Sequence, residues 1–171
     1  WYQFEQSLEW LETVKNRNFF LYFHSFEIPS FDKVKHDYFV DPALRSKSEL
    51  TPKEAEALDM QVYDSAVRFL DDYVGRLVGK LDELGLAENT LVVIYSDHGE
   101  EIWDRIPYYH AHGHSLYKEM IHVPMVMRFP GEIEPGTRVP RTVRLIDIAP
   151  TIFDYLGVPV PEEFQGVSLR R

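Results

Sequence analysis

The sequence predicts an α/β fold in which helices cover both faces of a mostly parallel sheet. An apolar, β-branched run from Leu91 to Tyr95 is typical of a strand that is buried on both faces, as strands of parallel sheets are. A long amphipathic pattern from Thr51 to Gly85 precedes this run, in the order of a crossover helix and the strand that it feeds. The chain has 171 residues, of which 44% are hydrophobic, so we expect one domain over residues 1–171 and no second domain.

The first part of the chain predicts a helix, a strand and a loop. Apolar residues from Phe4 to Val14 recur at helical spacing, which predicts an amphipathic helix that ends near Asn16. Phe19 to Phe23 is predicted as a buried strand. The stretch from Glu27 to Ser48 has no clear period and contains two prolines, so we expect a long surface loop, which in compact α/β domains is often functional.

The long helix has clear signals at both ends. Thr51 is the expected N-cap, Pro52 fits the first helical position, and Glu54 completes a capping box. Gly85 supplies the C-terminal stop. Further along the chain, Val123 to Phe129 is predicted as a strand and Asp147 to Leu156 as a short helix closed by Gly157.

Composition restricts the classes of partner. The formal net charge of −10 argues against nucleic acid or an anionic membrane as the main partner, because both would be repelled at long range. The absence of cysteine excludes disulfides and thiolate zinc sites but leaves the compartment open, whether cytoplasmic, periplasmic or secreted. No run is long and apolar enough to span a membrane. The start at Trp1 shows no signal pattern. Because the sequence opens on tryptophan and not on methionine, we expect it to be part of a longer protein.

The chemistry is predicted where the central strand stops. After the apolar run and Ser96 come Asp97 and His98, which precede Gly99. Ligands of α/β sheets bind beyond the carboxyl ends of the strands, and a turn at Gly99 would let both side chains reach one divalent cation. The alternative is that Asp97 caps a turn and that His98 has no role.

A second candidate segment is rich in histidine. Four of the seven histidines lie between residues 98 and 114, and His110, His112 and His114 alternate. Neutral imidazole is both a metal ligand and a proton donor near neutral pH, so this concentration favours a metal or acid/base site. In an extended segment the three rings would share one side. The alternative is a polar surface loop with one useful histidine.

The order of these motifs resembles the central and C-terminal part of the sulfatase family, within the alkaline phosphatase superfamily. The resemblance spans nearly the whole chain in the family's order. It rests on five stretches: Asn18 to His24, Tyr63 to Glu100, His112 to Glu119 with Val123 and Pro124, Leu145 to Thr151, and Gly157 with Gly166 to Leu169. It implies an alkaline-phosphatase-like sandwich, here incomplete, and a parent protein that hydrolyses sulfate or phosphate esters.

The resemblance also implies roles for single residues. Asp97 and His98 match the family's pair of metal ligands, with calcium the first expectation and magnesium, manganese or zinc compatible. His112 matches the histidine that contacts the transferred group or the leaving oxygen, and His114 occupies the neighbouring variable position as a substrate contact. Many relatives carry a further histidine soon after the strand that ends at His24; here it is missing, so His24 or His36 is the candidate for that contact.

Two parts of the family's site have no counterpart in this sequence. The early acidic pair of metal ligands is absent, and so is the nucleophile, a cysteine converted to formylglycine, or a serine or threonine, in a Cys/Ser-x-Pro-x-Arg type motif. We therefore expect the chain alone to be inactive. The alternatives are a phosphoglycerol or phosphoethanolamine transferase of the same superfamily, and a non-catalytic structural or binding domain.

The expected partner is a small anionic ester, with neither nucleic acid nor a membrane segment involved. A chain that lacks part of its sheet would expose a strand edge and apolar surface, so self-association is also expected. The sequence leaves the ester unidentified.

Overall fold

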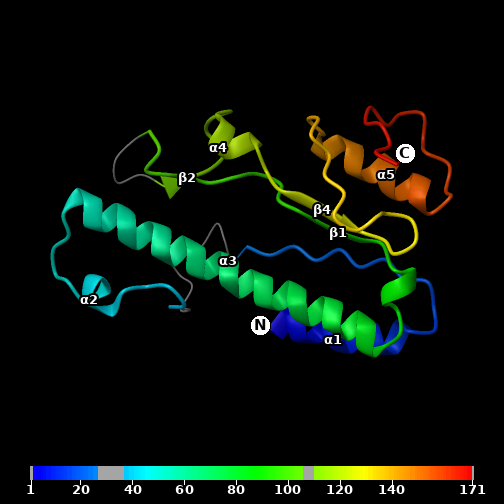
Figure 1. Cartoon of the computed structure of the whole chain (residues 1–171), viewed down its shortest axis with the longest axis horizontal. Coiled ribbons are helices and arrows are strands. Elements are labelled where there is room, and N and C mark those ends of the chain that lie inside the picture. Colours follow the sequence, from blue (N-terminus) through cyan, green and yellow to red (C-terminus); the bar gives the residue numbers. More distant parts are fainter. Residues whose placement is uncertain (1, 27–36, 106–109, 171) are drawn as a thin grey trace. The chain divides into compact units, whose positions relative to one another are not determined.

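A computed structural model describes residues 2–26, 37–105 and 110–170. The chain divides into two compact units, one of residues 1–87 and 98–123, the other of residues 88–97 and 124–171. Both contain helix and strand, as the sequence predicts for an α/β protein (Figure 1).

The first unit is built on two helices, α1 (Tyr2–Val14) and α3 (Pro52–Glu83), which lie alongside each other (Figure 1). The ring of Phe4 on α1 stacks on that of Tyr73 on α3, with 4.2 Å between centroids, and Phe69 packs beside them. Arg76 of α3 pairs with Glu5 of α1 at 2.7 Å. Burial of these aromatic rings, with Leu8, Leu70 and Leu77 packed against them, stabilises the pairing of the two helices.

The predicted start and end signals of α3 are confirmed. The backbone N–H of Thr51 donates to the Glu54 carboxylate at 3.0 Å, and the Thr51 hydroxyl donates to the same oxygen at 2.8 Å. Gly85 follows the helix with φ +70°, a conformation that glycine adopts without steric cost. A short helix, α2 (Pro42–Arg45), precedes α3 and is capped by the Asp41 side chain.

The first unit also holds a two-stranded antiparallel pair. Strand β2 (Glu101–Ile102) pairs with β3 (His110–Ala111), with Glu101 opposite Ala111. Ile102 is buried against Ala66 of α3, so the pair is anchored to the long helix. Helix α4 (Lys118–Ile121) follows in the chain.

The second unit pairs β1 (Val92–Tyr95) with β4 (Met125–Arg128). The pairing is antiparallel, with Val92 opposite Arg128 and Tyr95 opposite Met125. Short 3₁₀ helices flank these elements, η2 (Ala87–Asn89) at the boundary of the units and η3 (Leu145–Asp147) before α5 (Ile148–Tyr155). Gly157, at φ +64°, ends α5 where the sequence predicts the stop.

Two strand predictions are wrong in detail. Residues 19–23 form no strand, and Phe20 and Tyr22 are 74% and 62% exposed, because no strand within the described part of the chain offers them a hydrogen-bonded ladder. The central strand has an antiparallel partner and is not buried on both faces, since Ile94 and Tyr95 are each 38% exposed.

Within the predicted loop from Glu27 to Ser48, residues 27–36 lie outside the described part of the chain, as does His36. The described remainder contains α2, so it is not irregular throughout. Among the described residues no helix combines the length and the apolar character needed to cross a membrane.

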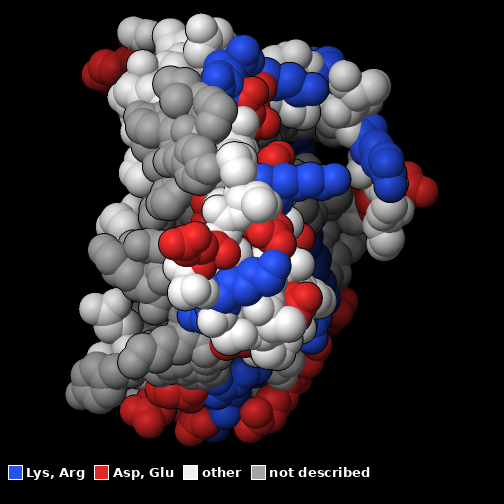
Figure 2. Space-filling model, turned by 90° about the vertical axis from the view of Figure 1, so that its left-hand side faces the viewer, with Lys and Arg blue, Asp and Glu red and all other residues white. Residues whose placement is uncertain are grey.

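On the face drawn in Figure 2, lysine and arginine side chains lie among the acidic ones, so basic and acidic residues do not form separate patches. Ion pairs along α3 have this character, for example Arg68 with Asp72 at 2.8 Å. Some of the acidic side chains are therefore paired locally with basic ones, and such exposed pairs contribute little to stability.

Candidate active site

The turn after β1 is held by the backbone of Gly99. Its N–H donates to the carbonyl of Met120 at 2.7 Å, which ties residue 99 to the end of α4. The Nδ1 atom of His98 lies 2.8 Å from the Gly99 carbonyl oxygen. A carbonyl oxygen only accepts, so Nδ1 carries the proton and the lone pair of the neutral ring is on Nε2.

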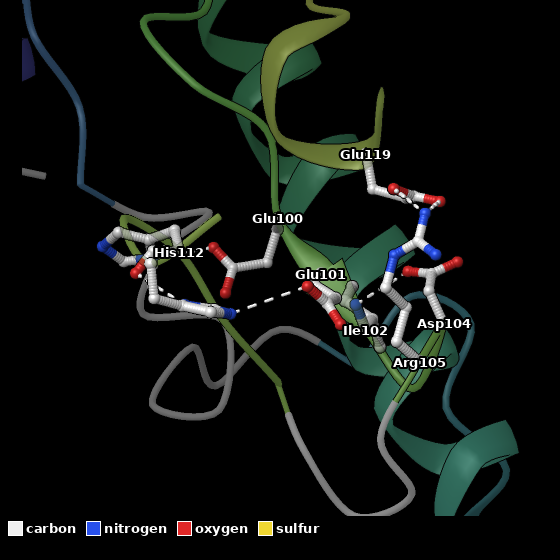
Figure 3. A network of polar contacts seen from close by, with 8 residues as sticks. Glu100, Glu101, Ile102, Asp104, Arg105, His112 and Glu119 are labelled. Carbon is white, nitrogen blue, oxygen red and sulfur yellow. Dashed lines mark hydrogen bonds and ion pairs between the residues drawn. The ribbon is translucent and has the colours of Figure 1, made fainter. Parts of the chain in front are cut away.

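The β2–β3 hairpin places Glu100 against His112. Continuing the register of Glu101 and Ala111 by one residue sets Glu100 opposite His112. Nδ1 of His112 lies 2.9 Å from Oε2 of Glu100 (Figure 3). The Glu100 side chain is only 4% exposed, whereas that of His112 is 40% exposed. The carboxylate therefore sits beneath an imidazole that is open to solvent.

Three potential ligand groups converge here. The rings of His98 and His112 are stacked, with centroids 4.4 Å apart and an angle of 18° between their planes. One ligand atom each from His98, Glu100 and His112 lies within 4.8 Å of the others. Two imidazoles and a carboxylate form a donor set that suits a divalent metal, an acid/base centre, or both.

The next carboxylate contacts the next histidine of the motif. The Glu101 side chain is 3% exposed, and its Oε2 lies 3.6 Å from Nε2 of His114. Nδ1 of His114 lies 3.3 Å from the carbonyl oxygen of His112. Consecutive buried glutamates thus face the two histidines that flank Gly113.

The hairpin is supported from α3 and α4. Trp103 has φ +60°, a strained conformation for a bulky residue, and its indole N–H donates to Asp59 of α3 at 2.7 Å. Arg105 makes a two-oxygen contact with the Glu119 carboxylate, at 3.1 Å to each oxygen (Figure 3). Burial raises the pKa of Tyr63 on α3, and the charge of Glu100 raises it further. The hydrogen bonds of Trp103 and Arg105 hold in place the hairpin that carries Glu100 and His112.

The structure brings together some of the predicted residues. His98 and His112 are in contact, as the histidine-rich pattern suggests. Asp97 is exposed and belongs to the unit that contains β1. His24 is exposed, with its ring stacked on Phe26 at 4.5 Å, and among the described residues neither His24 nor His114 joins the group of close ligand atoms.

Sequence reasoning missed the two glutamates and one detail of the histidine motif. Glu100 is the last residue of the motif that begins at Ser96. Its contact with His112 depends on the register of β2 and β3, which cannot be seen in the sequence. The expectation that three histidines share one side assumed an extended segment, and Gly113, at φ +81°, interrupts the extended conformation between His112 and His114. The side-chain position of His110 lies outside what the structure describes.

Known proteins resemble this chain in sequence and in structure. The sulfatase family matches residues 3–158. Arylsulfatase K of Homo sapiens is 31% identical over 170 residues, a match that covers 97% of this chain and 30% of the relative. The chain thus spans about a third of the length of this curated relative.

Two solved structures are similar in fold as well. The phosphonate monoester hydrolase SpPMH of Silicibacter pomeroyi is 31% identical, with a TM-score of 0.64 over 83% of this chain and 29% of that protein. The structure of BT4656 in complex with its substrate, D-glucosamine-2-N,6-O-disulfate, is 30% identical, with a TM-score of 0.59 over 75% of this chain and 26% of that protein. These similarities confirm the predicted fold class, and the match over residues 3–158 shows that the chain belongs to the sulfatase family.

Proposed function

We propose that the whole protein is a divalent-metal-dependent hydrolase of sulfate esters. The observation that carries this proposal is the stacking of the His98 and His112 rings, within a chain that matches the sulfatase family from residue 3 to residue 158. The naming of a relative as an arylsulfatase supports a sulfate ester as the substrate.

Residues 1–171 would then form the central to C-terminal part of the catalytic domain. The sequence contains no Cys/Ser-x-Pro-x-Arg motif for a nucleophile and no counterpart of the early acidic ligands. The 171 residues alone are therefore expected to be catalytically inactive.

Asp97 and His98 are the proposed metal ligands. His98 fits this role because its Nδ1–H is engaged by the Gly99 carbonyl, which orients the ring and sets its lone pair on Nε2. An exposed carboxylate at Asp97 supplies a hard oxygen ligand, and calcium is the ion that we propose. A bound cation would offset the negative charge of the sulfate group and of the chain around it.

His112 is the proposed general acid. Its ring is partly exposed and its Nδ1–H is held by Glu100, so the acid form is the doubly protonated ring, which would give its Nε2 proton to the departing oxygen and return to the neutral Nδ1–H form. His114 and His24 are proposed as contacts to the anionic group of the substrate. The neighbour solved with a disulfated glucosamine supports a sulfated sugar as the substrate class.

A second candidate reaction is hydrolysis of a phosphorus ester. It is favoured by one observation, the 31% identity to a phosphonate monoester hydrolase. Sulfate and phosphonate monoesters are similar in size and charge, so the residues of this chain alone would serve either. A superfamily transferase acting on phosphoglycerol or phosphoethanolamine would use the same Asp97 and His98 pair.

The deciding experiment compares 4-nitrophenyl sulfate with 4-nitrophenyl phenylphosphonate as substrates of the whole protein. The enzyme is first stripped of metal with a chelator and then supplied with calcium, magnesium, manganese or zinc in turn. We expect a higher kcat/KM for the sulfate, and activity that depends on returned metal, highest with calcium. Turnover of neither ester with any metal would favour a structural or binding domain.

Self-association is proposed for the 171-residue chain when it is produced alone. Ile94 on β1 and Val126 on β4 are 38% and 59% exposed, and both strands belong to a sheet of only two strands among the described residues. Sedimentation velocity over a range of protein concentrations would detect it, and a single monomeric species at all concentrations would contradict it.

A further inference from the structure

We infer that Glu100 is a positioning residue that fixes the orientation and tautomer of the His112 ring. This inference rests on the proposed function of His112 and names a residue to which the family resemblance gave no role. Its starting point is the hydrogen bond between Oε2 of Glu100 and Nδ1 of His112, at 2.9 Å, in a hairpin whose register sets the two residues opposite each other.

Burial gives this hydrogen bond its importance. The Glu100 side chain is 4% exposed, so its carboxylate has little access to water and needs a donor from the protein. An ionised carboxylate only accepts, so Nδ1 of His112 carries the proton. The remaining lone pair is then on Nε2, the nitrogen on the opposite edge of the ring from Glu100.

The His112 ring is held on a second side. The His98 ring stacks on its face at 4.4 Å, while Glu100 holds its Nδ1 edge. One contact restricts rotation about χ2, and the other restricts displacement of the ring plane. Together they present one defined edge of a side chain that is 40% exposed.

The same geometry argues against Glu100 and both rings as three ligands of one ion. An imidazole nitrogen binds a metal in the plane of its ring, and two rings whose planes differ by 18° and whose faces are stacked direct their lone pairs side by side, not toward one point. Glu100 is therefore assigned to the ring of His112, while His98 remains a ligand candidate.

A glutamine at residue 100 would test this assignment with little change in volume. Its amide can turn the NH₂ group toward Nδ1, which favours the neutral tautomer with the proton on Nε2, and an uncharged amide does not offset the positive charge of the doubly protonated ring that acts as the acid. Loss of a carboxylate that orients a functional histidine costs roughly 10- to 100-fold in activity. We expect Glu100→Gln to lower kcat by about that factor on an ester with a poor leaving group while KM changes by less than about twofold.

The kinetic test uses the whole protein with four variants: Glu100→Gln, His112→Ala, the combination of the two, and one control. In a His112→Ala background, Glu100→Gln should cause no further loss, because its effect passes through the ring. The matched control is Glu83→Gln, which removes an exposed carboxylate that pairs with Lys80 on α3; it should leave the dependence on leaving group unchanged. Additive losses for Glu100→Gln and His112→Ala would overturn the inference.

A second readout does not require activity. Ring ¹⁵N chemical shifts of His112 should show the Nδ1–H tautomer in the wild-type protein and a shift toward Nε2–H in Glu100→Gln. A wild-type Nε2–H tautomer would overturn the inference, as would a loss of metal affinity in Glu100→Gln equal to that in His98→Ala. If the tautomer changes as expected but no ester is hydrolysed, Glu100 still positions the ring and only the proposed function fails.

Discussion

Gly99 lies so close to the backbone of Glu119 that a Cβ atom at residue 99 would be 1.9 Å from the Glu119 carbonyl oxygen. The obstacle is backbone, so no change of side-chain rotamer could relieve it. The approach accompanies the hydrogen bond from Gly99 N–H to the Met120 carbonyl at 2.7 Å. Glycine at this position therefore sets the path of the chain between His98 and Glu100.

Replacement of Gly99 by alanine should destabilise the protein and disturb the site. We expect a loss of about 1–3 kcal/mol, the range for overpacking at a tight contact. Urea unfolding of the whole protein measures it. Gly75→Ala is the control, because a Cβ there meets nothing within 4 Å on an α3 surface where alanine is the better helix former. Equal stability of Gly99→Ala and wild type would show that the close approach is not maintained.

Replacement of Asp97 by alanine should abolish metal-dependent turnover. Loss of a direct ligand should cost more than the roughly 10- to 100-fold that loss of an outer partner costs. Metal content and kcat/KM of the purified whole protein measure it, with Asp71→Ala, on the exposed surface of α3, as control. Wild-type activity of Asp97→Ala at ordinary metal concentration would remove Asp97 from the ligand set.

Replacement of His112 by alanine should slow esters with poor leaving groups far more than activated aryl esters. Proton donation matters most when the departing oxygen is basic, and general acid catalysis contributes about 10²- to 10⁴-fold. A plot of log kcat/KM against leaving-group pKa should therefore become steeper in the variant. Equal losses on 4-nitrophenyl sulfate and on an alkyl sulfate would contradict the acid role.

Replacement of Asp147 by asparagine should destabilise the second unit. Burial raises the pKa of this carboxyl, but hydrogen bonds from Val167 N–H and from the side chain and backbone of Arg144 outweigh burial and leave the pKa below the ordinary 3.8. Val167 N–H donates to Oδ1 at 3.0 Å, so the carboxylate joins the start of α5 to the C-terminal segment. Hydrogen bonds to a charged group are worth about 1.5–3 kcal/mol, which is the expected loss.

The pH dependence of this contribution follows from the lowered pKa. A carboxyl with a lower pKa in the folded state stabilises the fold fully above its unfolded value of 3.8, and this contribution is lost as pH falls through the lower folded value. The difference in free energy of unfolding between the wild type and Asp147→Asn should thus shrink below pH 4, as urea unfolding at several pH values would show. A difference that is constant from pH 7 to pH 2 would exclude the carboxylate as its source.

The carboxyl of Glu54 should titrate far below a free glutamate. Hydrogen bonds from Lys47, then from the Thr51 backbone and hydroxyl, lower its pKa from 4.5 to about 2. Its support of the α3 N-terminus is therefore present above pH 4.5 and lost as pH falls through about 2. NMR titration of the side chain measures the midpoint, and Lys47→Met should raise it. A midpoint near 4.5 in the wild type would contradict the capping geometry.

The sequence by itself determined the elements whose signals are local. The N-cap at Thr51, the stop at Gly85 and the apolar stripe between them act within one helix, so α3 was predictable at both ends. The family, the fold class and the pair of histidines 98 and 112 also followed from motifs in the chain. The metal ligands and the acid role remain predictions.

Tertiary structure alone decided the contacts that join distant residues. The exposure of residues 19–23 and the antiparallel partner of β1 depend on which strands supply a ladder, and a single strand's sequence does not encode its partner. The pairing of Glu100 with His112 depends on the register of a hairpin, and the requirement for glycine at residue 99 depends on the approach of α4. Hydrogen bonding between strands and backbone packing between segments set these relationships, and both arise only when the chain has folded.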